Sequence, residues 1–221
     1  MLNRFSDSLI NKQQPGFKIF MNSTKPNIYL IPRWAGTIHS DWYDWMVLEI
    51  KLKFHVEIHR FEMPDWDQPD ISKSIQFLES EISELNENTY FIGHSVGCQA
   101  ILRFIDQQLK VNKNLKIGGF LFVAGWFEVD KPWLSLKPWM KIENVDFHGI
   151  SQQINFKKVL ISDNDPFTTD FLKNKSLWYE YINAGVNIYH NKLHFNNSIE
   201  IEVLNEIEKM INYSINVNNL S

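Results

Sequence analysis

The residues best placed to do chemistry are Gly93, His94, Ser95, Val96 and Gly97, which match the pattern G-x-S-x-G. A serine becomes an accessible nucleophile when a tight turn between a strand and a helix holds its oxygen above a sheet, and glycine is favoured at the crowded flanking positions. The helix that follows directs its first amide at the same point, where an N–H can stabilise an oxyanion. The pattern therefore predicts Ser95 as nucleophile and the Val96 N–H as one donor of an oxyanion hole.

A five-residue pattern also arises by chance, and the alternative is a capping serine at an ordinary junction of strand and helix. The context favours the catalytic interpretation, because the apolar run TYFI precedes the motif and the helical pattern CQAILRFI follows it. We interpret His94 as structural, since a neighbour of the serine points elsewhere on such a turn and a base must reach the serine oxygen. Cys98, the single cysteine of the chain, should face the core.

A nucleophilic serine needs a general base and a group that orients the base. Where the serine lies on a G-x-S-x-G turn between a strand and a helix, these partners follow along the chain as Asp or Glu and then His, each on a loop after a later strand. Asp163 and Asp165 follow the predicted strand KVLIS, and His194 follows the predicted strand VNIYH. Asp163 is nearer to its strand and could instead cap the turn, whereas Pro166 stiffens the loop behind Asp165. Spacing alone therefore leaves the two aspartates as alternatives. A lone histidine is more often a surface residue, but a place after the last strand favours His194 as the base.

Alternating strands and helices must position these residues. We expect strands at 28–31, 55–61, 89–93, 117–124, 158–162 and 186–190, and helices at 42–54, 71–85, 96–109 and 198–211. This order predicts the α/β class, with a mostly parallel six-stranded sheet and helices on both faces. Residues 125–150 interrupt the alternation with three tryptophans and two prolines, and we interpret them as a small cap-like insertion. Residues 1–26 should form a partly ordered extension, and residues 27–221 a single domain.

The composition narrows the class of protein further. With 221 residues, of which 44% are hydrophobic, the chain suits one globular domain, and a net charge of −4 without a clustered basic face argues against nucleic-acid binding. The sequence shows neither a membrane span, nor a signal peptide, nor a pair of cysteines, so we expect a cytoplasmic protein with no membrane partner. It also shows no metal-ligand spacing and no glycine-rich phosphate loop, so we expect neither metal nor cofactor. The oligomeric state stays open.

The chain also resembles a known family over nearly its whole length, from Ile28 to Ile211. The resemblance rests on the stretches IPRWAGTIHSDWYDW, MPDWDQP, YFIGHSVGCQAILRFI, FLFVAGW, LISDNDPF and HNKLHFNN. They are similar to the small α/β-hydrolases typified by bacterial YdeN proteins and by retinoblastoma-binding protein nine. That family carries a serine in G-H-S-x-G, an aspartate directly before proline and a histidine before phenylalanine. The resemblance implies an α/β-hydrolase fold with a triad of Ser95, Asp165 and His194, and it selects Asp165 over its neighbour.

Two positions depart from the family pattern. Members often carry His-Gly or Pro-Gly after the first strand, where backbone amides complete the oxyanion hole, but this chain reads PRWAG at residues 32–36. The Trp34 N–H is our candidate for the second donor. The Gly-His-Phe of the family is Leu193-His194-Phe195 here, so the loop that holds the histidine could differ.

Aromatic residues on the loops after the strands suggest a pocket. Trp34, Trp126 and Trp133 could line an apolar site for an acyl or aryl group. Arg33 could bind a substrate carboxylate there, although an ion pair with Asp41 or Asp67 is the interpretation that we favour.

Together these features predict a serine hydrolase that cleaves small ester or amide substrates through an acyl-enzyme intermediate. The alternative is a binding protein on a degraded hydrolase scaffold. The retained serine, aspartate and histidine favour the enzyme, because a protein that only binds need keep none of them. The altered loop at residues 32–36 favours the binding protein.

Overall fold

The structure is a computed structural model that describes residues 25–219. The predicted extension at residues 1–26 therefore lies outside the described residues, except for its last two. One six-stranded sheet has the order β2-β1-β3-β4-β5-β6, and every neighbouring pair is parallel. The strands are β1 (Asn27–Ile31), β2 (Ile58–Arg60), β3 (Thr89–His94), β4 (Ile117–Val123), β5 (Ile154–Ser162) and β6 (Gly185–Tyr189). The helices are α1 (Tyr43–Phe54), α2 (Ile71–Glu81), α3 (Val96–Val111), α4 (Phe147–Gln153), α5 (Phe171–Ile182) and α6 (Ile201–Asn218), with a short 3₁₀ helix η1 (Lys137–Met140).

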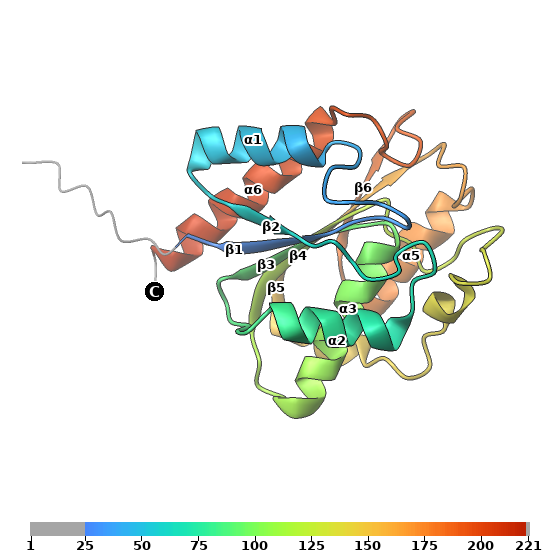
Figure 1. Cartoon of the computed structure of the whole chain (residues 1–221), viewed down its shortest axis with the longest axis horizontal. Coiled ribbons are helices and arrows are strands. Elements are labelled where there is room, and N and C mark those ends of the chain that lie inside the picture. The colour runs from blue at the N-terminus through green and yellow to red at the C-terminus, as the bar shows by residue number, and fades with distance from the viewer. Residues whose placement is uncertain (1–24, 220–221) are drawn as a thin grey trace, which may run out of the picture.

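Helices cover both faces of the sheet, as Figure 1 shows for α1 and α6 on one side and α2 and α3 on the other. Two separate apolar clusters fill the spaces between these layers. Because β3 and β4 are central and covered on both faces, all of their residues are buried, and their sequences are continuous apolar runs without alternation. The carboxyl ends of all six parallel strands meet at one edge of the sheet, which is where ligands bind in open α/β sheets.

Several predicted boundaries are wrong. The second strand begins at Ile58, not His55, because His55 ends α1 in a left-handed conformation with φ of 54°. The fifth strand begins four residues early, at Ile154, since its first residues already pair with β4. Helix α2 stops at Glu81, and the last helix occupies 201–218 in place of 198–211. Helix α5 was not predicted, although three of its buried residues recur at a spacing of four.

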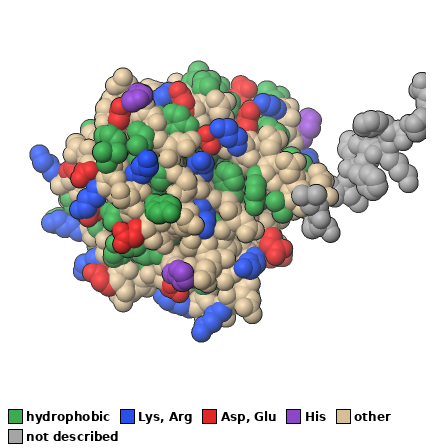
Figure 2. Space-filling view, turned by 180° about the vertical axis from the view of Figure 1, so that it is seen from behind, with side chains coloured by type: hydrophobic (Ala, Val, Ile, Leu, Met, Phe, Trp, Pro, Cys, Tyr) green, Lys and Arg blue, Asp and Glu red, His purple; other side chains and the backbone are tan. Residues whose placement is uncertain are grey.

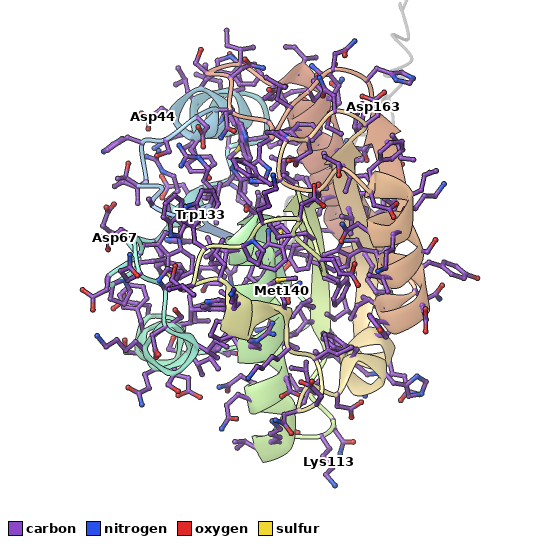
Figure 3. All side chains as sticks on the ribbon, turned by 90° about the vertical axis from the view of Figure 1, so that its right-hand side faces the viewer. Asp44, Asp67, Lys113, Trp133, Met140 and Asp163 are labelled. Atoms are coloured by element: carbon purple, nitrogen blue, oxygen red, sulfur yellow. The ribbon has the colours of Figure 1, made fainter. Side chains whose placement is uncertain are left out.

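The segment 125–150 is loop and 3₁₀ helix for most of its length, but its end differs from the prediction. Helix α4 starts at Phe147 and packs against α3 and α5, so residues from 147 onward belong to the helical layer of the sheet. Figure 3 shows the remaining segment, with Trp133 and Met140 labelled, in front of α3.

The surface carries both signs of charge. On the face shown in Figure 2, basic and acidic side chains are interspersed among apolar and uncharged ones. Within residues 25–219, no helix has both the length and the apolar character that a membrane crossing requires.

Candidate active site

Ser95 lies on a strained turn between β3 and α3, with φ of 56° and ψ of −119°. Non-glycine residues rarely adopt this conformation, and where they do the surrounding structure must hold it. The flanking glycines allow this, because neither position has room for a side chain. A Cβ at Gly97 would lie 2.4 Å from the Ile31 carbonyl oxygen, and one at Gly93 would lie 2.9 Å from the Cys98 backbone nitrogen. The motif thus has the tight strand-to-helix turn that its sequence predicts.

The histidine and one of the two aspartates form a buried pair. His194 Nδ1 lies 2.7 Å from Asp165 Oδ2, and the other carboxylate oxygen accepts the Phe167 N–H at 2.9 Å. The exposed fractions of His194 and Asp165 are 5% and 3%. A carboxylate at Nδ1 holds the imidazole proton on that nitrogen and leaves Nε2 free to accept a proton.

Asp163 has a different set of contacts. Its Oδ2 lies 2.5 Å from Nδ1 of the exposed His190, and its Oδ1 accepts the Asn191 N–H at 3.0 Å. These bonds, and that of the backbone N–H first, lower the pKa of the Asp163 carboxyl. Asp163 therefore fastens the turn after β6 to the turn after β5, and it does not contact His194.

Ser95 and His194 line the same cavity, but no hydrogen bond joins their side chains in the described chain. The donor that reaches Ser95 Oγ is the Trp126 indole Nε1–H, at 3.2 Å. Catalytic contacts are often long in a site without substrate and tighten when substrate binds.

The backbone amides of Val96 and Trp34 have no acceptor among the residues that the structure describes. Val96 is the first residue of α3, so its N–H has no partner within the helix. In the turn after β1, the other amides are occupied, with Arg33 donating to Tyr43 Oη, Ala35 to Trp66 O and Gly36 to Arg33 O. Proline has no N–H, so Trp34 has the one amide of this turn that donates to no described residue.

His94 connects the turn after β1 to the loop of His194. Its fully buried ring donates from Nε2 to the His194 carbonyl oxygen at 2.9 Å and accepts at Nδ1 from Tyr43 Oη at 2.8 Å. The same tyrosine oxygen accepts the Arg33 N–H at 3.2 Å. Burial first, and then the neighbouring His194, lower the pKa of His94 well below its usual range, so the ring is neutral. The predicted structural role of His94 agrees with these contacts.

A cavity of about 300 Å³ opens beside Ser95. It is lined by Arg33, Trp34, Ser95, Trp126, Val129, Trp133, Leu136, Phe167, His194 and Asn196. The rings of Trp34 and Trp133 stack with their centroids 4.6 Å apart, and Trp133 in turn contacts Phe167 at 5.6 Å. The predicted pocket residues Arg33, Trp126 and Trp133 all belong to this lining, whose walls are mainly aromatic and aliphatic.

The positive charge of Arg33 is compensated by an ion pair with Asp41. Its Nε donates to Asp41 Oδ2 at 2.7 Å and its Nη2 to Asp41 Oδ1 at 3.2 Å, while Nη1 donates to the Trp34 carbonyl at 3.0 Å. Asp67, the other partner considered from the sequence, instead accepts the Trp34 indole N–H through its backbone. The paired guanidinium therefore gives the cavity no uncompensated positive charge.

Gln99 and Arg103, which were not predicted as functional residues, hold the loop between Trp126 and Lys141. Arg103 Nη2 donates to the carbonyls of Trp139 and Lys141, at 2.7 Å each, and Nη1 donates to Gln99 Oε1 at 2.6 Å. Gln99 Nε2 in turn donates to the Trp126 carbonyl. Burial lowers the pKa of Arg103 to about 10, which leaves it charged at neutral pH. The sequence does contain an indication of this role, because Arg103 interrupts the apolar run AILRFI. A buried arginine needs several hydrogen-bond acceptors, so such a position predicts a structural contact.

No group of three or more His, Cys, Asp and Glu side chains between residues 25 and 219 is arranged to hold a metal ion.

The chain and its fold have relatives among known proteins. A profile described as serine hydrolase matches residues 28–212. The chain belongs to the serine hydrolase family. YdeN of Bacillus subtilis (strain 168) is 29% identical over 138 residues, which cover 62% of this serine hydrolase and 70% of YdeN.

Solved structures show the same fold. The crystal structure of the Bacillus subtilis ydeN gene product superposes with a TM-score of 0.73, at 22% identity, over 85% of this serine hydrolase and 99% of that protein. Est1E from Butyrivibrio proteoclasticus superposes with a TM-score of 0.58, at 11% identity, over 86% and 90% of the two chains. The predicted α/β-hydrolase fold, with six parallel strands between helices, is confirmed.

Proposed function

We propose that this serine hydrolase cleaves small ester or amide substrates through an acyl-enzyme, with Ser95 as nucleophile, His194 as base and Asp165 as the group that orients the base. The observation that carries the proposal is the buried Asp165–His194 pair, at 2.7 Å, whose histidine lines the same cavity as a serine on a strained turn. Groups so arranged are the parts that acyl transfer requires.

In the proposed reaction, His194 Nε2 accepts the Ser95 proton while Oγ attacks the carbonyl carbon of the substrate. The free amides of Val96 and Trp34 support a role as oxyanion donors, since a developing negative charge is stabilised by fixed N–H groups. The tetrahedral intermediate then expels the leaving group, which takes the proton from His194. Water then attacks the acyl-enzyme through the same two steps, with His194 again as base, and the carboxylic acid is released from Ser95.

The lining of the cavity supports a neutral substrate with a compact apolar acyl group. Arg33 is paired with Asp41, so a substrate carboxylate would compete with an existing two-bond ion pair. We also propose that residues 125–136 act as a cap, because Trp126, Val129, Trp133 and Leu136 all contribute to the cavity from this part of the segment.

Labelling with a fluorophosphonate probe tests this function, because the probe reports an activated serine without needing the physiological substrate. We expect the wild-type protein to be labelled and Ser95→Ala to lose both labelling and ester turnover, with kcat lower on the order of 10⁶-fold. Ser74→Ala is the matched control, since it removes another buried serine hydroxyl, one that donates to the Asp70 carbonyl and does not line the cavity.

The test also separates the enzyme from a binding protein on the same scaffold. A folded wild-type protein that is neither labelled nor active on p-nitrophenyl esters would refute the proposal. Equal labelling of the wild type and Ser95→Ala would refute the choice of nucleophile.

A further inference from the structure

The hydrogen bond from Trp126 to Ser95 takes no part in the reaction proposed above. The Trp126 side chain is 1% exposed, and its Nε1–H donates to Ser95 Oγ at 3.2 Å. The residue is fixed from its other side, because its carbonyl oxygen accepts the Gln99 amide. An indole nitrogen can donate but not accept, and this one has no second acceptor in the described chain.

The strength of such a bond depends on the chemical state of the acceptor. A hydroxyl or alkoxide oxygen is a good acceptor, whereas the alkoxy oxygen of an ester is a poor one, and charge on the acceptor strengthens the bond further. A buried donor that loses its acceptor is costly. The bond from Trp126 is therefore strong when Ser95 is free, weak when Ser95 is acylated, and strong again as Oγ departs from the acyl group.

We propose that Trp126 is a catalytic hydrogen-bond donor that acts on the Ser95 oxygen itself and promotes deacylation; this inference rests on the proposed function. In that step, water attacks the acyl carbonyl carbon while His194 Nε2 takes a proton from it. The tetrahedral intermediate then collapses, and the bond between carbon and Oγ breaks with its electron pair going to Oγ. The Trp126 N–H stabilises the charge that builds on Oγ until His194 returns the proton to it.

Acylation gains little from the same contact. It starts from the serine hydroxyl, which already accepts the indole N–H, so the ground state and the transition state are both stabilised. Removal of the donor should therefore slow deacylation and leave acylation nearly unchanged. In an acyl-enzyme mechanism, a slower second step lowers kcat and KM together and preserves kcat/KM.

The experiment follows p-nitrophenyl acetate hydrolysis by Trp126→Phe, in the steady state and in the first turnover. The acetyl group is small, so changes in the shape of the cavity should matter least. We expect kcat and KM to fall by the same factor, up to about tenfold, the effect of one buried hydrogen bond, with kcat/KM retained. The burst of p-nitrophenol should rise toward one equivalent per active site, because the acyl-enzyme accumulates.

Trp139→Phe is the matched control. Trp139 is also 1% exposed, lies in the same segment and loses an equivalent bond, from its Nε1–H to the Pro69 carbonyl at 3.0 Å. It should lose stability like Trp126→Phe while keeping the wild-type kcat, KM and burst. Trp126→Met is a second variant without the donor, and its flexible side chain fills the space if phenylalanine impairs folding. Circular dichroism and the thermal midpoint establish that each variant is folded.

The outcomes separate this inference from the proposed function. A fall in kcat/KM without a larger burst, in a folded variant, would mean that Trp126 only positions Ser95 or the substrate, and would overturn the inference. Unchanged kinetics would overturn it as well. Either result leaves the proposed function intact as long as wild-type turnover depends on Ser95, whereas loss of that dependence would overturn both.

Discussion

Asp163 and Asp165 form a matched pair for testing how the histidine is held. Both follow β5, and each contacts Nδ1 of a histidine, at 2.5 Å for His190 and 2.7 Å for His194. The His190 side chain is 85% exposed, however, whereas that of His194 is 7% exposed. The same substitution at two positions, Asp to Asn, therefore separates an effect on the site from an effect on the loop.

The neighbours of Asp165 determine what an asparagine would do there. The Phe167 N–H donates to Oδ1 at 2.9 Å, so the amide oxygen must remain at that position and the amide nitrogen must replace Oδ2. That nitrogen would donate to His194 Nδ1 and force the ring proton onto Nε2, the atom that has to accept the serine proton. We expect Asp165→Asn to lower kcat by about 10⁴-fold, which corresponds to roughly 5 kcal/mol in the barrier. The unfolding free energy should change little, because both hydrogen bonds persist.

The assay is the steady-state hydrolysis of p-nitrophenyl acetate, with thermal midpoints measured in parallel. Asp163→Asn should keep kcat within about threefold of the wild type, since the Asp163 side chain contacts His190 and Asn191 in the turn after β6 and does not contact His194. Equal losses in the two variants would refute the assignment. So would an Asp165→Asn protein that retains more than about a tenth of the wild-type kcat, because the wrong tautomer cannot act as a base.

Three further predictions concern the turn at Ser95, the buried His94 and the cavity. Gly97→Ala should lower the unfolding free energy by about 1–3 kcal/mol and kcat by about 10²-fold, because its Cβ would lie 2.4 Å from the Ile31 carbonyl oxygen. Urea unfolding and turnover assays test this. Gly185→Ala is the control and should change neither quantity, because the atom nearest to its Cβ would lie 3.4 Å away. His94 takes up a proton in the unfolded chain below about pH 6.5 but not in the fold, so its contribution to stability decreases as the pH falls below that value. Between about pH 7 and about pH 5, the unfolding free energy of His94→Gln, measured by urea titration, should therefore fall less steeply than that of the wild type, by up to about 1.4 kcal/mol per pH unit. Equal slopes of the unfolding free energy against pH in the two proteins would contradict this. Across p-nitrophenyl acetate, butyrate, octanoate and palmitate, kcat/KM should rise at first by up to about 0.8 kcal/mol per CH₂ and then fall once the cavity of about 300 Å³ is full, so a maximum at palmitate would contradict the assigned pocket.

The contiguous parts of the site could be predicted from the sequence. The turn at Ser95 depends on steric crowding between residues adjacent in the chain, so the glycines at 93 and 97 and the flanking apolar runs were enough to predict it. The central strands β3 and β4 could also be predicted, because a strand covered on both faces must be apolar throughout. The order of serine, aspartate and histidine followed from the expected order of the strands. Choosing Asp165 over Asp163 needed the family resemblance, since both residues have the same local chemistry.

Contacts between distant segments could not be predicted. The sequence left Arg33 with two possible partners, and the packing of the turn after β1 decided for Asp41. The bond from Trp126 to Ser95 joins residues 31 apart, and it exists because parallel pairing brings the ends of β3 and β4 side by side. Such bonds depend on rotamers and on fractions of an ångström between loops, whereas the hydrophobic pattern constrains only which face of an element is buried. The sequence by itself therefore determined the six strands, most of the helices and the order of the candidate catalytic residues, and the tertiary structure decided which polar groups meet.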